Sequence, residues 1–349
     1  VLTPTRISSE SQLIEIFGEP ADGNAETWWT AASFLSYGGV LEVVRTETSG
    51  QLSASDDAVT SPYTLAITTK DVYEATYLDA TANPFKWAAR DVGADGNAIK
   101  VAVIDKGADV SLKLDGALAT TTIGTQIANT SANKSGYIYA WDAGTNTVSI
   151  ITSDTWTTSD VVENGVTDLN VTTVSDWYDA QDVFTGLKWS SIGPRPGTST
   201  HVAARGGAND EVHIAVWDST GVITGTPNTL LEKFTYASKA NNGKTAQGAG
   251  NYYPQIILDQ SNFVYWGAHE TAVYDVSANQ AASGGNIAGS GNAGSDSTTT
   301  FDLFAEPTSY TLAKGAETLG ASSGEIITGL QEFADTETCL LYTSDAADE

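Results

Sequence analysis

The chain has 349 residues, with 43 acidic against 16 basic side chains and a formal charge of −27 at pH 7. This balance argues against nucleic-acid binding, because phosphate recognition needs clustered Lys and Arg, and the sequence contains no such cluster. No run of residues approaches the roughly 18 apolar positions of a membrane-spanning helix, and a single cysteine forms neither an internal disulfide nor a thiolate metal site. Hydrophobic residues make up 41% of the chain, enough for a large core, and the length predicts two or three domains.

Both ends of the sequence predict a fragment. The chain begins at Val1 without a methionine, in the middle of a patterned segment. Residues 339–349 resemble the translation of an adapter used in building sequencing libraries, so we expect them to be an assembly artefact. The natural part of the chain is therefore expected to lack cysteine.

Residues 1–50 predict two helices followed by a strand. Ser9 or Ser11 is expected to cap the first helix. Leu13, Ile14 and Phe17 are expected to share its apolar face. Gly18 and Pro20 are expected to end the helix. The second helix is expected to follow from Asn24, and its helical spacing and end are marked by Trp28, Ala31, Ala32 and Leu35, then Gly38 and Gly39. Residues 40–45 then predict a largely buried strand. The two helices and this strand would form an α/β layer that later parts of the chain must complete.

The next segments predict mostly β-structure. Residues 51–84 are expected to form an extended connection with one strand at 63–67, and residues 85–105 a core segment with a turn at 95–97 and a strand at 99–105. Residues 106–190 predict an inserted all-β domain. Its strands are expected at residues 110–114, 136–141, 148–153 and 171–174.

The last third predicts a β-rich domain at residues 191–277, a Gly/Ser-rich flexible loop at 278–300, and the start of a further core segment at 301–338. Strands are expected at residues 211–218, 230–237, 253–258, 262–266 and 310–313. In the first of these, alternation places Val212, Ile214 and Val216 inward and His213 and Ala215 outward. Ser322 and Glu325 predict a capping box before a helix at 325–334. The expected fold class is α+β, β-dominated and multidomain.

No catalytic motif in the sequence is convincing. Residues 320–324 match a GxSxG pattern, but no hydrophobic strand precedes it, and a helix cap explains its serines. Residues 241–245 resemble the end of a phosphate loop, but Ser238 stands where the first glycine should be. The loose calcium-loop pattern at 91–97 lacks the terminal Glu ligand and is better explained as a turn. The histidines are far apart in the sequence: His201, His213 and His269. We therefore expect no enzyme, no cofactor and no metal site.

The N-terminal pattern resembles the contractile tail sheath proteins of myophages, in particular the T-even-like group. The residues that carry the resemblance are Leu13, Ile14, Phe17, Gly18, Pro20, Trp28, Leu35, Tyr37, Gly38, Val43, Val44 and Arg45. Further similar blocks follow in the family's order at residues 87–103, 212–266 and 310–335, with Val92 and Gly93 in place of the family's Pro-Gly. Residues 106–190 show no residue match, and insertions of this kind face outward in the family.

This resemblance implies a discontinuous α/β sheath core with an inserted, protruding all-β domain. It also implies a mechanical function in the virion, after assembly in the host cytoplasm. Subunits would form stacked hexameric rings around the tail tube and contract to drive the tube through the host envelope. The implied partners are other copies of the chain, the tail tube protein, and the baseplate and tail terminator proteins, with no nucleic acid and no membrane insertion.

Two other classes stay open. The first is an acidic secreted or virion β-protein that binds carbohydrate, a receptor or Ca²⁺; the second is an acidic glycoside hydrolase with two carboxylates in one cleft. The β-protein predicts no N-terminal α/β layer. The sheath interpretation requires residues 13–17 and 28–35 to pack on residues 40–45.

Overall fold

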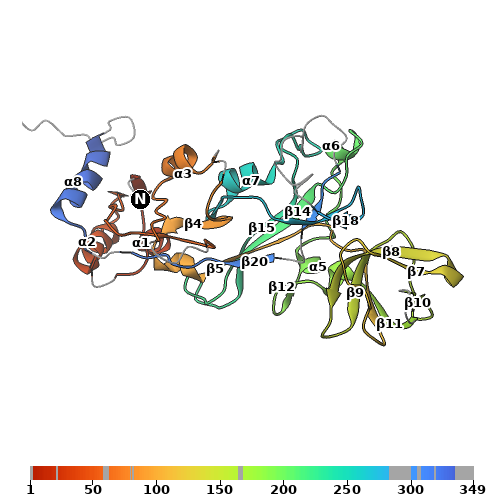
Figure 1. Cartoon of the computed structure of the whole chain (residues 1–349). Coiled ribbons are helices and arrows are strands. Elements are labelled where there is room, and N and C mark those ends of the chain that lie inside the picture. Colours follow the sequence, from red (N-terminus) through yellow and green to blue (C-terminus); the bar gives the residue numbers. More distant parts are fainter. Residues whose placement is uncertain are drawn as a thin grey trace, which may run out of the picture. The chain divides into compact units, whose positions relative to one another are not determined.

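The computed structural model describes residues 3–20, 23–57, 63–78, 80, 82–163, 168–282, 300–304, 308–317 and 320–334. These residues form two compact units (Figure 1). Unit 1 comprises the described parts of residues 1–81, 88–97 and 313–349, and unit 2 comprises those of residues 82–87 and 98–312. The fold is α+β and β-dominated, with several sheets and few helices, which confirms the predicted fold class.

Unit 1 is built from short elements. Its strands and helices are β1 (Thr5–Ile7), α1 (Glu10–Phe17), α2 (Ala25–Ser36), β2 (Leu41–Val43), β3 (Ser53–Ser55), α3 (Lys70–Thr76), α8 (Ser323–Gln331) and the 3₁₀ helix η3 (Glu332–Ala334). Two more elements, β4 (Trp87–Val92) and the 3₁₀ helix η1 (Ala94–Ala98), begin or end at a boundary between the units. The C-terminal segment of unit 1 returns beside β3, where the Leu52 N–H donates to the Ala316 carbonyl at 2.8 Å.

The two predicted N-terminal helices are present. Ser9 caps α1 by accepting from the Gln12 N–H, and Gly18 ends that helix at a positive φ of 78°. The shared core of these helices and the first two strands consists of Ile7, Leu13, Trp28, Ala32 and Leu35. Phe17, Leu41 and Val43 pack against this core.

Two details of the N-terminal prediction are wrong. Ile14 does not share the buried face with Leu13, because the short helix turns it toward solvent. The strand expected at residues 40–45 is only Leu41–Val43 and is half-buried. It pairs antiparallel with β1, which the sequence analysis did not predict. The two helices cover one face of this two-stranded ribbon, and the other face stays open, so the strand is only half-buried.

The extended connection predicted at residues 51–84 is also wrong in part. It contains α3, which Thr69 caps by accepting from the Val72 N–H. The strand expected at residues 63–67 is absent from the described structure there, since the Leu65 carbonyl accepts from Ser53 N–H without a regular ladder. A helix of seven residues is too short to show a clear helical period in the sequence.

Unit 2 is organised around a four-stranded antiparallel sheet. Its order is β15 (Thr229–Ser238), β14 (Glu211–Asp218), β5 (Ile99–Ile104) and β20 (Thr308–Thr311). The strand predictions at residues 99–105, 211–218 and 230–237 are confirmed, and the strand expected at 310–313 lies two residues earlier. The outward assignment of His213 and Ala215 is wrong: both are fully buried. Both faces of β14 are covered, so alternation no longer separates inside from outside.

Residues 253–258 form a helix and not the predicted strand. They belong to α7 (Tyr253–Gln260), which has Pro254 in its first turn. Proline is favoured there because the first helical N–H has no partner within the helix. Tyr253 and Ile257 are one turn apart and buried, a spacing that a short apolar run does not distinguish from a strand. The other predicted strand of this region is present as β16 (Val264–Trp266).

The insert forms a six-stranded antiparallel barrel within unit 2 (Figure 1). Its strands are β6 (Val110–Leu114), β7 (Gln126–Asn129), β8 (Lys134–Asp142), β9 (Thr147–Ile151), β10 (Val161–Val162) and β11 (Leu169–Asp176). Four of these, β6, β8, β9 and β11, were predicted. The two outer strands of the sheet order meet where the Glu163 N–H donates to the Ala128 carbonyl at 2.8 Å. This closure leaves the two end strands without a free edge at that point.

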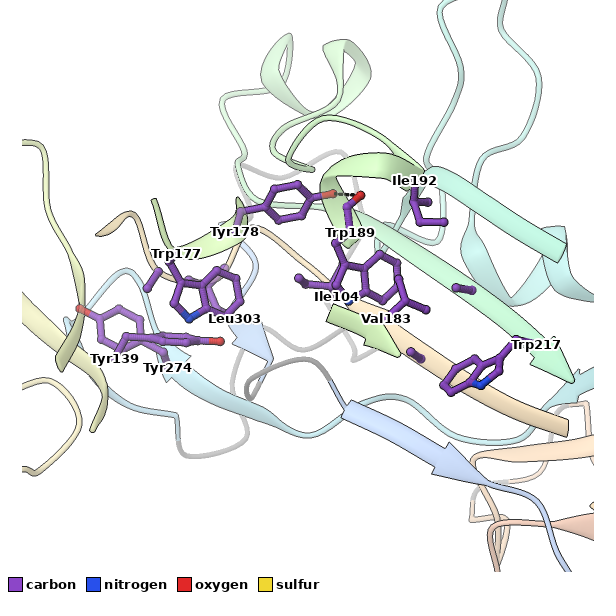
Figure 2. Close-up of a cluster of buried hydrophobic side chains, with 13 residues drawn as sticks. Ile104, Tyr139, Trp177, Tyr178, Val183, Trp189, Ile192, Trp217, Tyr274 and Leu303 are labelled. Carbon is purple, nitrogen blue, oxygen red and sulfur yellow. Dashed lines mark hydrogen bonds between the residues drawn. The ribbon is translucent and has the colours of Figure 1, made fainter. Parts of the chain in front are cut away.

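An aromatic cluster joins the barrel to the central sheet (Figure 2). We define it as Tyr139, Trp177, Tyr178, Trp189, Trp217 and Tyr274. Tyr139 comes from the barrel, and its hydroxyl donates to the Phe304 carbonyl at 2.5 Å. Its ring meets that of Trp177 edge to face, with centroids 5.6 Å apart. Each such pair adds about 0.5–1.5 kcal/mol beyond simple burial.

The remaining elements of unit 2 are short. They are α4 (Trp177–Ala180), β12 (Asp182–Phe184), β13 (Leu187–Lys188), α5 (Trp189–Ile192), α6 (Thr200–Ala203), the 3₁₀ helix η2 (Thr130–Ala132), β17 (Ala272–Asp275), β18 (Gln280–Ala281) and β19 (Leu303–Phe304). The predicted loop at 278–300 lies mostly outside the described residues, as does all of segment 339–349. Among the helices that the structure describes, none has the length and apolar character needed to span a membrane.

Gly107→Ala tests how tightly the aromatic cluster is packed. Gly107 has a φ of +56°, and an added Cβ would lie 2.0 Å from the Trp177 ring. We expect a loss of about 2–4 kcal/mol in the free energy of unfolding, from overpacking together with backbone strain. The matched control is Gly186→Ala, where φ is also positive but no atom lies within 4 Å. We expect about 1 kcal/mol there, and equal losses in urea unfolding would contradict the packing argument.

Candidate assembly surface

Large exposed apolar side chains gather on unit 1. The structure has ten of them among its described residues, and all but Val222 belong to unit 1. They are Ile14, Ile16, Trp29, Phe34, Tyr37, Val40, Ile326, Ile327 and Leu330. Unit 2 is the larger unit and exposes only Val222, so the concentration on unit 1 does not follow from size. Contiguous exposed apolar residues are typical of interaction sites.

The first ridge runs along the outer side of α2. We call Trp29, Phe34 and Tyr37 the α2 ridge; the three side chains are 57%, 50% and 91% exposed. Phe34 lies over Gly39, where an added Cβ would come within 2.2 Å of the ring. This contact holds Phe34 in place while leaving half of it open to solvent. Aromatic side chains that are already ordered before binding lose little entropy when a partner covers them.

The second ridge is on α8, and the orientation of this helix is unusual. The residue that faces the rest of unit 1 is Gly329, which lies against Thr46 and Val44. The large apolar residues Ile326, Ile327 and Leu330, which we call the α8 ridge, point outward instead. An amphipathic helix normally buries its apolar stripe. The α8 ridge is therefore placed to pack on another surface.

The start of α8 is firmly held. Ser322 and Glu325 form the predicted capping box, and Glu325 also accepts from the Ser49 N–H at 2.7 Å. The Ser49 and Ser322 N–H groups lower the pKa of Glu325 from its usual 4.5 to about 2. The same contacts show that the serines of the GxSxG pattern serve as a helix cap.

The charge around both ridges has one sign. Residues 9–44 contain several Glu side chains and no Lys, Arg or His. Residues 315–334 likewise contain Glu317, Glu325 and Glu332 but no basic side chain. Arg45 follows the first segment directly, and its guanidinium lies 3.7 Å from the Glu317 carboxyl group. The ridges are thus apolar surfaces with an acidic surround.

The residues that carried the family resemblance have different positions in the structure. Leu13, Trp28 and Leu35 are buried in the unit 1 core, and Phe17 and Val43 pack beside them. Gly18 and Gly38 follow the ends of α1 and α2 at positive φ, and Pro20 lies just beyond α1. Val44 and Arg45 lead from β2 toward α8 and Glu317. Ile14 and Tyr37 are exposed, and the sequence analysis did not predict their exposure.

The histidines do not come together into a site. His213 accepts from the Tyr236 N–H through Nδ1 at 3.0 Å, so its Nε2 donates to the Pro194 carbonyl at 2.8 Å. His269 lies among Tyr252, Tyr253 and Trp266, and burial lowers its pKa to about 4. The third, His201 in α6, contacts Arg205 two residues beyond the end of that helix. Within the described residues, no group of His, Cys, Asp and Glu is arranged to hold a metal.

The neighbouring tryptophans of α2 give a matched test of core against surface. Trp28 is buried and its indole N–H donates to the Gly18 carbonyl at 2.9 Å, whereas Trp29 is mostly exposed. We expect Trp28→Ala to lower the free energy of unfolding by about 3–5 kcal/mol, and Trp29→Ala by less than about 1 kcal/mol. Chemical denaturation of both variants measures this. Similar losses would mean that Trp29 is part of the core.

The cap of α8 predicts a specific pH dependence. Because the pKa of Glu325 is lowered, the stability that its carboxylate gives to α8 is fully present above the usual carboxyl pKa of 4.5 and is lost as the pH falls toward 2. The hydrogen-exchange protection factors of residues 323–331, which are corrected for the intrinsic rate at each pH, should therefore stay high at pH 4 and fall near pH 2. Glu325→Gln should remove this pH step. An unchanged profile in that variant would show that another group controls the helix.

A scan of protein-family models finds none that matches this chain, and a search of curated proteins finds no relative. A functional assignment therefore depends on the residues and their geometry. The feature with the clearest functional meaning is the pair of exposed apolar ridges on unit 1.

Proposed function

We propose that this chain is a structural subunit of a contractile phage tail sheath. Copies of it would polymerise as stacked hexameric rings around a tail tube and contract to drive the tube through the host envelope for genome ejection. The observation that carries the proposal is the concentration of exposed apolar side chains on unit 1. A protein whose function is to assemble needs such a surface, and a monomeric protein rarely keeps one.

The N-terminal layer also supports this proposal over its main rival. An acidic β-protein that binds carbohydrate, a receptor or Ca²⁺ has no need for an α/β layer before its strands. Here Leu13, Trp28 and Leu35 pack together with Leu41 and Val43. This is the packing that the sheath interpretation requires.

The proposed mechanism is mechanical and uses no cofactor or nucleotide. A sheath needs two packings of the same subunit that differ by only a few kcal/mol per copy, summed over many copies. Each unit must then move without unfolding. The aromatic cluster supports this, because it holds barrel and central sheet together within unit 2.

In this proposal the barrel faces outward and takes no part in polymerisation. Its sequence shows no residue match to the family, and its end strands meet instead of offering a free edge. The remaining proposed partners are the tail tube, baseplate and tail terminator proteins, in the virion. Assembly is proposed to take place in the host cytoplasm.

The ridges can be tested by the assembly of the natural protein that contains this sequence. Wild-type subunits are expected to form tubes or rings in electron micrographs and fast-sedimenting species in the ultracentrifuge. Replacing Trp29 and Tyr37 by Ser should reduce assembly at least tenfold, since each removes a large apolar contact. Val222→Ser is the control, because Val222 is 61% exposed but lies in unit 2. Normal assembly of the double variant would exclude this surface, and failure of the wild type to assemble would contradict the function.

The outward position of the barrel gives a second test. Val110 and Asp176 are paired neighbours in β6 and β11, so a short Gly/Ser linker can replace residues 111–175. Assembly of the shortened subunit is expected to be unchanged. Complete loss of tubes with a folded subunit, checked by circular dichroism, would assign the barrel to the assembly interface.

A further inference from the structure

The interior of unit 2 contains a lysine with no access to solvent. Lys239 follows β15 directly and is 0% exposed, and Asp105 follows β5 directly and is 1% exposed. The Lys239 Nζ lies 2.7 Å from the Asp105 Oδ2 and 2.8 Å from the backbone carbonyl of Asp302. It is also 4.1 Å from the centre of the Phe304 ring. An amine and a carboxyl group are thus held in contact in a dry, partly aromatic setting.

The carboxyl group of Asp105 is held at both oxygens. Its Oδ1 accepts from the Gly107 N–H at 3.0 Å, and its Oδ2 accepts from the Phe304 N–H at 2.8 Å. These donors fix the orientation of the group relative to Nζ. They are also placed to stabilise negative charge that develops on the carboxyl oxygens during attack at Cγ.

We propose that Lys239 and Asp105 condense to form an intramolecular amide cross-link between side chains. The proposal goes beyond the sheath function and does not depend on it. The reactants are a nucleophile and an electrophile in contact, and such proximity replaces a bimolecular encounter. An amine that has given up its proton to the carboxyl group is the nucleophile that this step requires.

The proposed step is a condensation that needs no oxidant or co-reactant. A proton passes from the Lys239 ammonium to the Asp105 carboxylate, which leaves a neutral amine and a neutral acid. The amine lone pair attacks Cγ, the C–N bond forms, and the bond from Cγ to Oδ2 breaks. Oδ2 leaves as water with two of the three original ammonium hydrogens. The third hydrogen stays on the amide nitrogen, and Oδ1 becomes the amide oxygen.

Asp302 positions the reacting amine. It is 1% exposed, and its backbone carbonyl accepts from the Lys239 Nζ at 2.8 Å. This contact and the one with Asp105 hold the amine in place, and Asp302 is not consumed.

The chain contains an internal comparison for this chemistry. Lys134 Nζ also lies 2.7 Å from a carboxyl oxygen, that of Asp160, but the two side chains are 21% and 5% exposed. Water solvates the exposed part of this second pair, and this solvation opposes a condensation that releases water. The cross-link is therefore proposed for the dry pair and not for the wet one.

The test is the mass of the intact, purified chain. We expect it to be lower than the sequence mass by one water molecule. Trypsin should then release residues 101–106 joined to residues 234–244, because an amide at Lys239 blocks cleavage there. The peptide containing Lys134 should be cleaved normally. A full sequence mass together with separate, normally cleaved peptides after prolonged incubation of the folded protein would overturn the proposal.

Two variants separate the chemistry from the fold. Lys239→Arg keeps the charge but removes the nucleophilic amine, so the missing water should return to the mass. Lys134→Arg should leave the water loss unchanged. Circular dichroism confirms that each variant is folded, and a water loss that persists in folded Lys239→Arg would assign it to another site.

Discussion

The architecture of unit 2 depends on the carboxyl group of Asp105. This group is fully enclosed at the end of β5, the central strand from which the barrel segment departs. It accepts from Gly107 at the start of the barrel segment, from Phe304 in β19 and from Lys239 at the end of β15. A buried charge without partners would cost several kcal/mol, so these segments must all be in place for the fold to be stable. One side chain thus ties together parts of the sequence that are up to 199 residues apart.

The aromatic cluster extends this constraint outward. Gly107 donates to Asp105 and has no side chain, which allows the Trp177 ring to lie directly against its backbone. Trp177 in turn meets Tyr139 of the barrel, whose hydroxyl reaches the carbonyl of Phe304. Polar and aromatic contacts therefore converge at the root of the insert. The segment that leads from β5 into the barrel is packed against Trp177 and hydrogen-bonded to Asp105 at Gly107. These contacts and those of Tyr139 hold the barrel to the central sheet.

The two units differ in how many large apolar side chains they expose among the described residues. Unit 2 buries the side chains on both faces of β14, including His213 and Ala215. Unit 1 has a small core around Leu13 and Trp28 and leaves apolar side chains on the outer faces of α1, α2 and α8. Acidic residues outnumber basic ones in the segments that carry these faces. The large packed core of unit 2 and the exposed apolar side chains of unit 1 are consistent with the proposed subunit of a polymer.

The sequence by itself determined the local features. The capping box of Ser322 and Glu325, the strands β14 and β15, and four barrel strands were predictable because caps, turns and alternation act over a few residues. It did not reveal that residues 253–258 are helical, because a short apolar run fits either period. Nor did it separate Leu13 from Ile14, since which face of a one-sided helix is buried depends on its neighbours. Only the tertiary structure decided these points, as well as the inverted orientation of α8 and the contact of Lys239 with Asp105, because burial and long-range contact are properties of the packed chain.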